Sequence, residues 1–293
     1  MHIALTGATG FVGSHILAEL LSAGHEVTAL VRDDADAAKV AARGAETAAV
    51  DLYDRPAVVK LLSDADGAVH TASPGDATSA DLDSAVAEAA IEAFDGTGKP
   101  FALISGAWVY GPNTAISEDS PFDPPAMVAW KEPIARRVLD TTGMRGIVPL
   151  SGVAYGDGGG GIPGLLLASP RDADGNLIML GTGQQHWSTV HVADLAAFFR
   201  RALENDSARG YYVIGDGQNP TVAELTEAAA GAVGAPGAVP GSEEEARTRV
   251  GDYLAEVLLL DQATTADKAR ADLGWQPSRP GLVDEFRRGS YRR

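Results

Sequence analysis

Short apolar runs alternate with helix-like patterns through the first half of the chain. The runs have the length of buried strands and cover residues 3–5, 26–31, 47–50, 67–70, 101–105 and 147–150. The stretches between them predict helices over residues 12–21, 33–43, 56–62, 79–94 and 126–142, the last with a possible kink at Pro133. Strands that alternate with helices form βαβ units with parallel strands. The pattern therefore predicts an α/β protein with a doubly wound parallel sheet.

The pattern changes after residue 155. A glycine-rich stretch at 156–164 predicts a mobile loop, and the stretch 234–245, rich in Gly, Pro, Ala and Glu, predicts a surface loop. The remaining signals predict helices at 190–203, 221–233 and 266–273 and a strand at 211–214. We predict a larger domain over residues 1–155, with 190–215 packing back on it. Residues 156–293 mainly form a smaller lobe that closes over a substrate.

Three glycines separate the first predicted strand from the first predicted helix, with the spacing G-x-x-G-x-x-G. The first allows a tight turn, the second lets the backbone approach a pyrophosphate, and the third lets the helix pack on the strand. The helix N-terminus offers free N–H groups to the phosphate. A flexible turn without a ligand is the alternative interpretation. The dinucleotide-binding residues predicted in this turn are Gly7, Thr9, Gly10, Phe11, Val12 and Gly13.

Composition and charge narrow the range of partners. The chain has 293 residues, of which 45% are apolar, and a formal net charge of −17. Such a charge argues against binding to nucleic acid or to an anionic membrane surface. The chain has no cysteine, which excludes disulfides and a thiol nucleophile. A strand predicted from residue 2 leaves no room for a signal peptide, and no apolar stretch is long enough to span a bilayer, so we expect a cytoplasmic protein.

The opening of the chain also resembles a known family. Residues 6–16, TGATGFVGSHI, are similar to the start of short-chain dehydrogenases/reductases, especially the extended and atypical, epimerase/dehydratase-like branches. The resemblance implies a Rossmann domain that binds a nicotinamide cofactor. It also implies a homodimer through a four-helix interface formed by helices 79–94 and 126–142. Asp51 and Leu52 resemble the family's pair beside the adenine, and the stretch Thr71, Ala72 and Ser73 after His70 resembles the segment under the cofactor ribose.

The residues after the second strand bear on the choice between NAD and NADP. In NAD-binding members an acidic residue at the end of this strand binds the ribose hydroxyls. That place is held by Val31, and Arg32 follows. An arginine can pair with a 2′-phosphate, which favours NADP(H). The competing hypotheses are that Asp33 reaches the ribose and selects NAD, and that Arg32 is an ordinary surface charge.

The resemblance implies a catalytic Ser/Thr, Tyr and Lys, and two of the three places depart from it. In the segment 104–111, similar to the S-S-x-x-V-Y-G motif, the catalytic hydroxyl position holds Gly106, with Ser105 one residue earlier. In the Y-x-x-x-K motif Lys131 is present, but Met127 replaces the tyrosine. A thioether cannot donate a proton. We predict Lys131 and Ser105 as catalytic residues, with Lys131 also holding the cofactor ribose.

The proton must then come from another group. Tyr155, after the sixth strand, is predicted as a catalytic residue, with His186 or water as alternatives. Side chains that can line an apolar pocket are Trp108, Trp130 and Trp187, although they can equally be core residues. Next to the last of these, Ser188 stands at or beside a family arginine that often holds a nucleotide-sugar phosphate, which argues against a nucleotide-sugar epimerase. No metal-ligand cluster or nucleophile elbow is evident.

The sequence as a whole predicts an NADP(H)-dependent oxidoreductase of a small, apolar or aromatic carbonyl or C=C substrate. A different class is a non-catalytic NADP(H)-binding sensor or partner-binding protein, which the two missing catalytic groups motivate. A third is a non-redox isomerase or lyase that retains its cofactor. The fold alone does not decide among the three.

Overall fold

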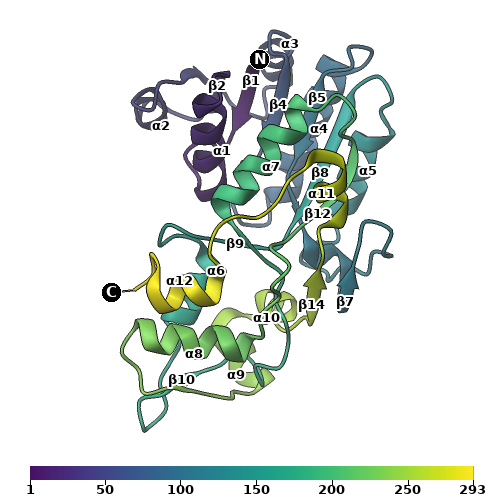
Figure 1. The fold of residues 1–293 in the computed structure, drawn as a ribbon. Coiled ribbons are helices and arrows are strands. Elements are labelled where there is room, and N and C mark those ends of the chain that lie inside the picture. The colour runs from purple at the N-terminus through teal and green to yellow at the C-terminus, as the bar shows by residue number, and fades with distance from the viewer. Residues whose placement is uncertain (293) are drawn as a thin grey trace.

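A parallel sheet forms the centre of the computed structural model, which describes residues 1–292 (Figure 1). The strand order is β12-β8-β5-β4-β1-β2-β3, with β6 paired to β8. The strands are β1 (His2–Thr6), β2 (Glu26–Val31), β3 (Glu46–Ala49), β4 (Gly67–His70), β5 (Pro100–Leu103), β6 (Ser105–Gly106), β8 (Arg145–Ser151) and β12 (Gly210–Ile214). The order reverses direction between β1 and β4, as in doubly wound sheets that bind ligands at this point. The predicted fold class is confirmed.

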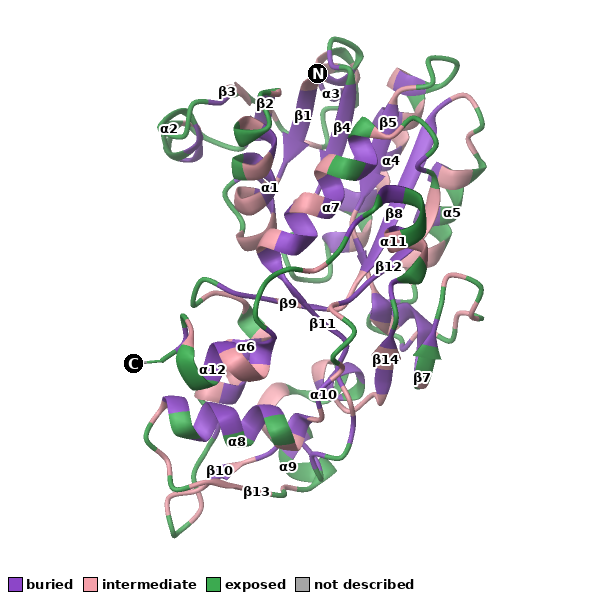
Figure 2. Ribbon diagram, viewed as in Figure 1, coloured by how far each residue is buried: buried purple, intermediate pink, exposed green. Residues whose placement is uncertain are grey.

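Helices cover both faces of the sheet. One face packs against α1 (Phe11–Ser22), α2 (Asp34–Ala41), α7 (Val192–Glu204) and α11 (Asp267–Leu273). The other packs against α3 (Arg55–Ser63), α4 (Ser79–Phe94) and α5 (Lys131–Asp140). Alternate residues of β1 serve the two layers, since Ile3 and Leu5 join the first core and Ala4 joins the second. Both faces of the strands are therefore buried (Figure 2), which explains their nearly continuous apolar sequence.

A smaller lobe lies below the sheet in the view of Figure 1. It contains α6 (Gly161–Leu167), α8 (Val222–Ala232), α9 (Glu243–Val250), α10 (Asp252–Leu258), α12 (Leu282–Arg288), β10 (Leu177–Ile178) and β13 (Ala238–Val239). Short parallel pairs connect it to the sheet: β9 (Val153–Tyr155) with β11 (Thr189–His191), and β7 (Asn113–Ile116), which follows the 3-10 turn η1 (Ala107–Tyr110), with β14 (Gln262–Thr264). The chain returns to the large domain at α11, after which the indole of Trp275 donates a hydrogen bond to Asp194 O, 2.8 Å away.

The helix predicted over 126–142 is shorter than expected. It begins at Lys131, and residues 126–130 form turns. The reason is Pro133, which lies in the first turn of α5 and not in its interior. A proline is tolerated there because the first N–H groups of a helix have no partner within the helix. Pro133 therefore marks the beginning of α5 and does not kink a longer helix.

The loop predicted over 156–164 is also wrong in part. Its second half belongs to α6, and its first half is held by residues near 290. Gly156 N donates to the Tyr291 hydroxyl at 2.7 Å, and Gly158 N donates to Ser290 Oγ at 2.8 Å. These contacts are distant in sequence, which explains why the glycine content alone predicted mobility.

The surface loop predicted over 234–245 contains the short strand β13 and the start of α9. The signal for α9 was present in the sequence, because Ser242 and Glu245 have the spacing of a capping box. In the structure each of these side chains accepts a hydrogen bond from the other residue's backbone N–H.

The outer faces of α4 and α5 are charged. Glu88 on α4 binds Arg55 and Arg137, and Glu92 also binds Arg55. These faces are the ones expected at a dimer interface, and the homodimer stays a prediction. No helix within residues 1–292 is long and apolar enough to cross a membrane.

The start of α7 is capped by a histidine side chain. His191 Nδ1 accepts a hydrogen bond from Ala193 N at 3.1 Å, so this nitrogen must be unprotonated. Burial lowers the pKa of His191 below its usual value of 6.5. Asp194 in the first turn of α7 accepts hydrogen bonds from Ser278 and Arg279. Both residues therefore have a structural role, which ties the start of α7 to its neighbours.

This cap predicts a loss of stability in acid. The pKa of His191 is lower in the folded than in the unfolded chain, so stability decreases as pH falls below about 6.5. His191→Asn keeps an acceptor at the cap but cannot titrate. Between pH 7 and pH 5 we expect the wild type to lose about 1 kcal/mol more than His191→Asn, the usual contribution of an N-cap. Urea unfolding at both pH values measures the difference, and equal losses would contradict the assignment.

Candidate functional site

Two pockets lie at the carboxyl edge of the sheet. The first, of about 650 Å³, follows the ends of β1, β2, β3 and β4, where the strand order reverses. The second, of about 300 Å³, follows β6, β8 and β9. Ligands of open α/β sheets bind at such an edge. Both volumes lie in the range of small-molecule sites.

The glycine turn forms one wall of the first pocket. Gly7, Thr9 and Gly10 line it, and Gly10 N donates to Gly7 O at 2.9 Å to close the turn. Gly7 has φ of +76°, which favours glycine. A Cβ atom on Gly13 would overlap the Gly7 carbonyl, so the absence of a side chain lets α1 begin against β1. Phe11 and Val12, predicted in the same set, line the second pocket instead.

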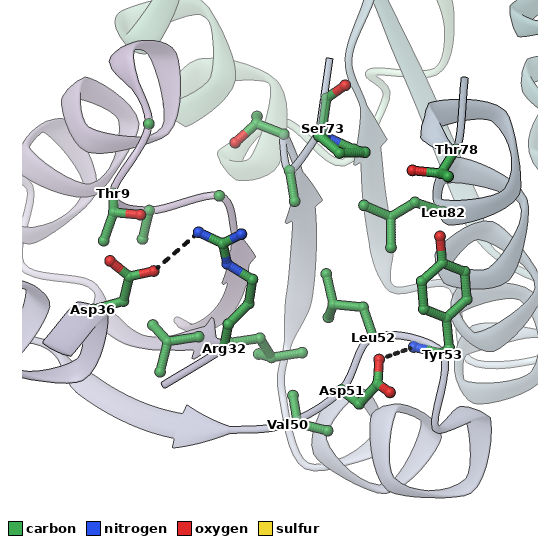
Figure 3. A pocket seen from close by; sticks show the side chains of 18 residues that line it. Thr9, Arg32, Asp36, Val50, Asp51, Leu52, Tyr53, Ser73, Thr78 and Leu82 are labelled. Carbon is green, nitrogen blue, oxygen red and sulfur yellow. Dashed lines mark hydrogen bonds and ion pairs between the residues drawn. The ribbon is translucent and has the colours of Figure 1, made fainter. Parts of the chain in front are cut away.

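The floor and far end of the first pocket come from the other predicted segments. Thr71, Ala72 and Ser73 line it after β4. Asp51 and Leu52 line it after β3, and Asp51 Oδ1 accepts a hydrogen bond from Tyr53 N at 3.0 Å (Figure 3). A floor of backbone and small side chains beside an apolar end can hold the ribose and adenine of a dinucleotide, with its pyrophosphate at the start of α1.

The three residues Arg32, Asp33 and Asp36 after β2 have different roles, and the sequence interpretation did not identify the role of Asp36. Asp33 caps α2, because its Oδ1 accepts from Asp36 N at 2.9 Å. The Arg32 side chain is 84% exposed at the rim of the first pocket, with Nη2 3.5 Å from Asp36 Oδ2 (Figure 3). A hydrogen bond from Lys39 lowers the pKa of Asp36. Asp36 therefore lines this pocket together with Asp51, and its position four residues after Arg32, on a predicted helix, was the available signal.

The second pocket has an apolar wall with few free polar groups. Ser151 donates to Gly152 O, Ser188 bonds Thr264, and Gln262, which the sequence interpretation did not identify, donates to Ala107 O and Gly111 O. These polar side chains already form hydrogen bonds within the protein. Side chains of the apolar wall are Phe11, Val12, Ile104, Trp108, Ile162 and Trp187.

Ser105 differs from the other polar residues of this pocket. It lines the second pocket, and its hydroxyl has no hydrogen-bond partner among residues 1–292. A hydroxyl group supplies both a donor and an acceptor. Ser105 can therefore bind an oxygen atom of a ligand in this pocket, although the motif alignment placed the catalytic hydroxyl at Gly106.

Lys131 lies outside both pockets, against α4. Its Nζ is 3.3 Å from Asp83 Oδ2 and 4.2 Å from the centre of the Trp130 ring. Trp130 is therefore separate from the other two predicted pocket tryptophans. Its indole N–H donates to Met127 O, and Met127 stands where the family has its tyrosine.

The structure does not support Tyr155 as a proton donor. Its side chain is buried, and its hydroxyl donates to Asp216 Oδ2 and to Pro280 O at 3.1 and 2.9 Å. Burial, with the nearby Asp216 carboxylate, raises the pKa of Tyr155 well above its usual range. His186 also lies outside the second pocket. Its Nδ1 is hydrogen-bonded to Asp261 Oδ1 at 2.8 Å. Within residues 1–292, no group of three potential metal ligands comes together.

The chain matches the family model described as "NAD dependent epimerase/dehydratase family" over residues 3–215. The chain belongs to this family. The match covers the sheet, the glycine turn and the lining residues of both pockets except Gln262. The atypical branch is supported as well, since relatives include epimerase family proteins named SDR39U1.

Two of the relatives are similar to this chain over nearly its whole length. The yeast Saccharomyces cerevisiae protein YLL056C is 29% identical over 297 residues, which cover 98% of each chain. A Streptomyces protein named 3-diazoavenalumate denitrifying reductase is 26% identical, covering 97% of this chain and 98% of the relative. The solved structure of human epimerase family protein SDR39U1 with NADPH has a TM-score of 0.75 at 21% identity and covers 99% of both chains.

The close approach of α1 to β1 makes Gly13 a sensitive position of this family fold. In Gly13→Ala the new methyl group overlaps the Gly7 carbonyl, and we expect a loss of about 1–3 kcal/mol in unfolding free energy. Gly231→Ala is the matched control, because its Cβ on α8 meets open space and should stabilise by about 0.5–1 kcal/mol. Thermal unfolding of both variants measures this. A Gly13→Ala protein as stable as the wild type would mean that the turn is looser than described.

Proposed function

We propose that the protein is an NADP(H)-dependent reductase of a small apolar or aromatic carbonyl or C=C compound. The observation that carries the proposal is the free hydroxyl of Ser105 in an apolar pocket beside the glycine turn. The relative named as a reductase supports the same class of reaction. Hydride transfer is the chemistry that a bound nicotinamide supplies.

Arg32 supports the choice of NADP(H). Its guanidinium is exposed at the rim of the first pocket, where it can pair with a 2′-phosphate. Asp33, the competing NAD reader, uses its carboxylate to cap α2. The solved human neighbour contains NADPH, which agrees with this choice.

The second pocket supports a neutral, apolar substrate. No Asp, Glu, Lys or Arg of residues 1–292 is among its lining residues, and two tryptophans form part of its wall. Ser105 Oγ donates a hydrogen bond to the substrate oxygen and stabilises the negative charge that develops there. The proton comes from water, since Tyr155 and His186 both bond other groups outside this pocket.

The test of this function is turnover by a serine variant. NADPH oxidation is followed with a panel of aromatic aldehydes, aromatic ketones and conjugated enones. Ser105→Ala should lower kcat/KM about 100-fold, because it removes the donor to the developing charge, while NADPH affinity stays unchanged. Ser151→Ala is the control, since its hydroxyl bonds the backbone in the same pocket, and a loss below about threefold is expected. Equal turnover by Ser105→Ala and the wild type would remove Ser105 from the reaction.

The cofactor assignment predicts opposite effects of two neighbouring changes. Arg32→Ser removes the pair to the 2′-phosphate and should weaken NADPH binding about tenfold or more, with little effect on NADH. Asp36→Asn removes the anion that competes for Arg32 and should strengthen NADPH binding about two- to fivefold. Calorimetric titration with both nucleotides measures this. If NADH binds more tightly than NADPH to the wild type, Asp36 reads a ribose hydroxyl and the NADP(H) assignment is wrong.

A second candidate follows from Met127. Because a thioether occupies the place of the usual proton donor, the protein can instead be a sensor that binds NADP(H) without turnover. A sensor binds NADPH and turns over no member of the panel, and its partner distinguishes NADPH from NADP⁺. Absence of turnover combined with tight NADPH binding would favour this candidate over the reductase.

A further inference from the structure

A buried carboxylate lies between the cofactor-pocket floor and Lys131. The Asp83 side chain on α4 is 7% exposed. Its Oδ1 is 3.1 Å from His70 Nε2, and its Oδ2 is 3.3 Å from Lys131 Nζ. A buried carboxylate is costly unless it is paired and hydrogen-bonded, and here each oxygen has its own partner.

Hydrogen bonds at the other end determine which nitrogen of His70 carries the proton. Thr6 Oγ1 accepts from Thr71 N at 3.2 Å and from Ala72 N at 3.3 Å. Its single hydrogen is then directed to His70 Nδ1, 2.6 Å away. His70 Nε2 is therefore the N–H that donates to Asp83. The line Thr6–His70–Asp83–Lys131 is satisfied at every step.

This line begins beside the first pocket and passes through a helix that lines it. Thr71 and Ala72, whose N–H groups bind Thr6, line the pocket floor. Thr78, just before α4, and Leu82 on α4 line the same pocket. The hydroxyl oxygen of Ser79, one helical turn before Asp83, lies 3.1 Å from Ser73 Oγ. The face of α4 that carries Asp83 is thus the face that meets the pocket.

We propose that Asp83 is a positioning residue that fixes the ammonium of Lys131, the group that the family resemblance predicts to hold the cofactor ribose. The carboxylate on one side and the Trp130 ring on the other limit where Nζ can lie. The inference rests on the proposed function, since it requires a nicotinamide nucleotide that Lys131 contacts. It adds Asp83, which would affect cofactor binding only through Lys131.

Asp83→Asn is the informative change because the two side chains have nearly the same shape. The amide oxygen still accepts the His70 N–H, whereas the amide nitrogen faces Lys131 Nζ and cannot accept from it. Lys131 then loses its restraint while the His70 end stays bonded. We expect NADPH binding to weaken about tenfold.

A double-mutant cycle on NADPH affinity tests the proposal. The proteins are wild type, Asp83→Asn, Lys131→Met and the double variant, with Asp81→Asn on an exposed position of the same helix as control. If Asp83 acts through Lys131, Asp83→Asn weakens binding about tenfold in the wild type and less than about twofold beside Lys131→Met. Should Lys131→Met fail to fold, Lys131→Gln, which can still donate to Asp83, completes the cycle.

The outcomes separate this inference from the function on which it rests. Thermal unfolding is measured on every variant, since a purely structural pair would lower thermal stability and leave NADPH affinity equal to that of the Asp81→Asn control. That result, or equal tenfold losses in both Lys131 backgrounds, overturns the positioning role while the reductase proposal stands. A wild type that binds no nicotinamide nucleotide overturns both proposals.

Discussion

The close contact between the start of α1 and the end of β1 is the constraint on which the site depends. Gly13 has no Cβ, so the helix can begin directly against the Gly7 carbonyl. Because the helix begins there, the turn before it lines the first pocket with Thr9 and Gly10, and its first residues, Phe11 and Val12, line the second. The absence of a side chain at Gly13 thus allows the two pockets to lie next to each other along one edge of the sheet. The neighbouring strands of the sheet determine only the distances between the other walls of the two pockets.

The site lacks the tyrosine that is the family's usual proton donor but retains the lysine of the same motif. Met127 replaces the tyrosine, and the lysine of the same motif has a carboxylate partner on α4. The buried Asp83 would be destabilising without both His70 and Lys131. The lysine is therefore coupled to the pocket floor through a line of bonds that does not include the missing hydroxyl. In the proposed reaction, chemistry then depends on Ser105 and on water, which an apolar pocket admits in small numbers.

Most of the sheet and the glycine turn could be predicted from the sequence because their signals are local. Strands buried on both faces appear as continuous apolar runs, and the glycine spacing marks the turn. What could not be predicted depends on residues far apart in the chain. The pairs β9–β11 and β7–β14 are too short to have a pattern of their own. Asp83 was hidden for the same reason, because an acidic residue in an Ala-rich helix normally faces water, and its partners lie 13 and 48 residues away. The hydrogen bonds of Tyr155 were hidden as well, because its partners Asp216 and Pro280 also come from distant segments.

The contacts of Ser290 and Tyr291 with the stretch 156–160 have a consequence for the order in which the protein acquires its parts during synthesis. The first pocket is built from residues 7 to 82, so its walls can assemble once the early strands and α4 have left the ribosome. The second pocket includes Gly160, and the neighbouring Gly158 is fixed only when residue 290 is available. A nascent chain can therefore form the nucleotide end of the site long before it can enclose a substrate. Binding of a nucleotide at that stage would stabilise the unfinished domain by mass action, and it would carry no risk of premature turnover.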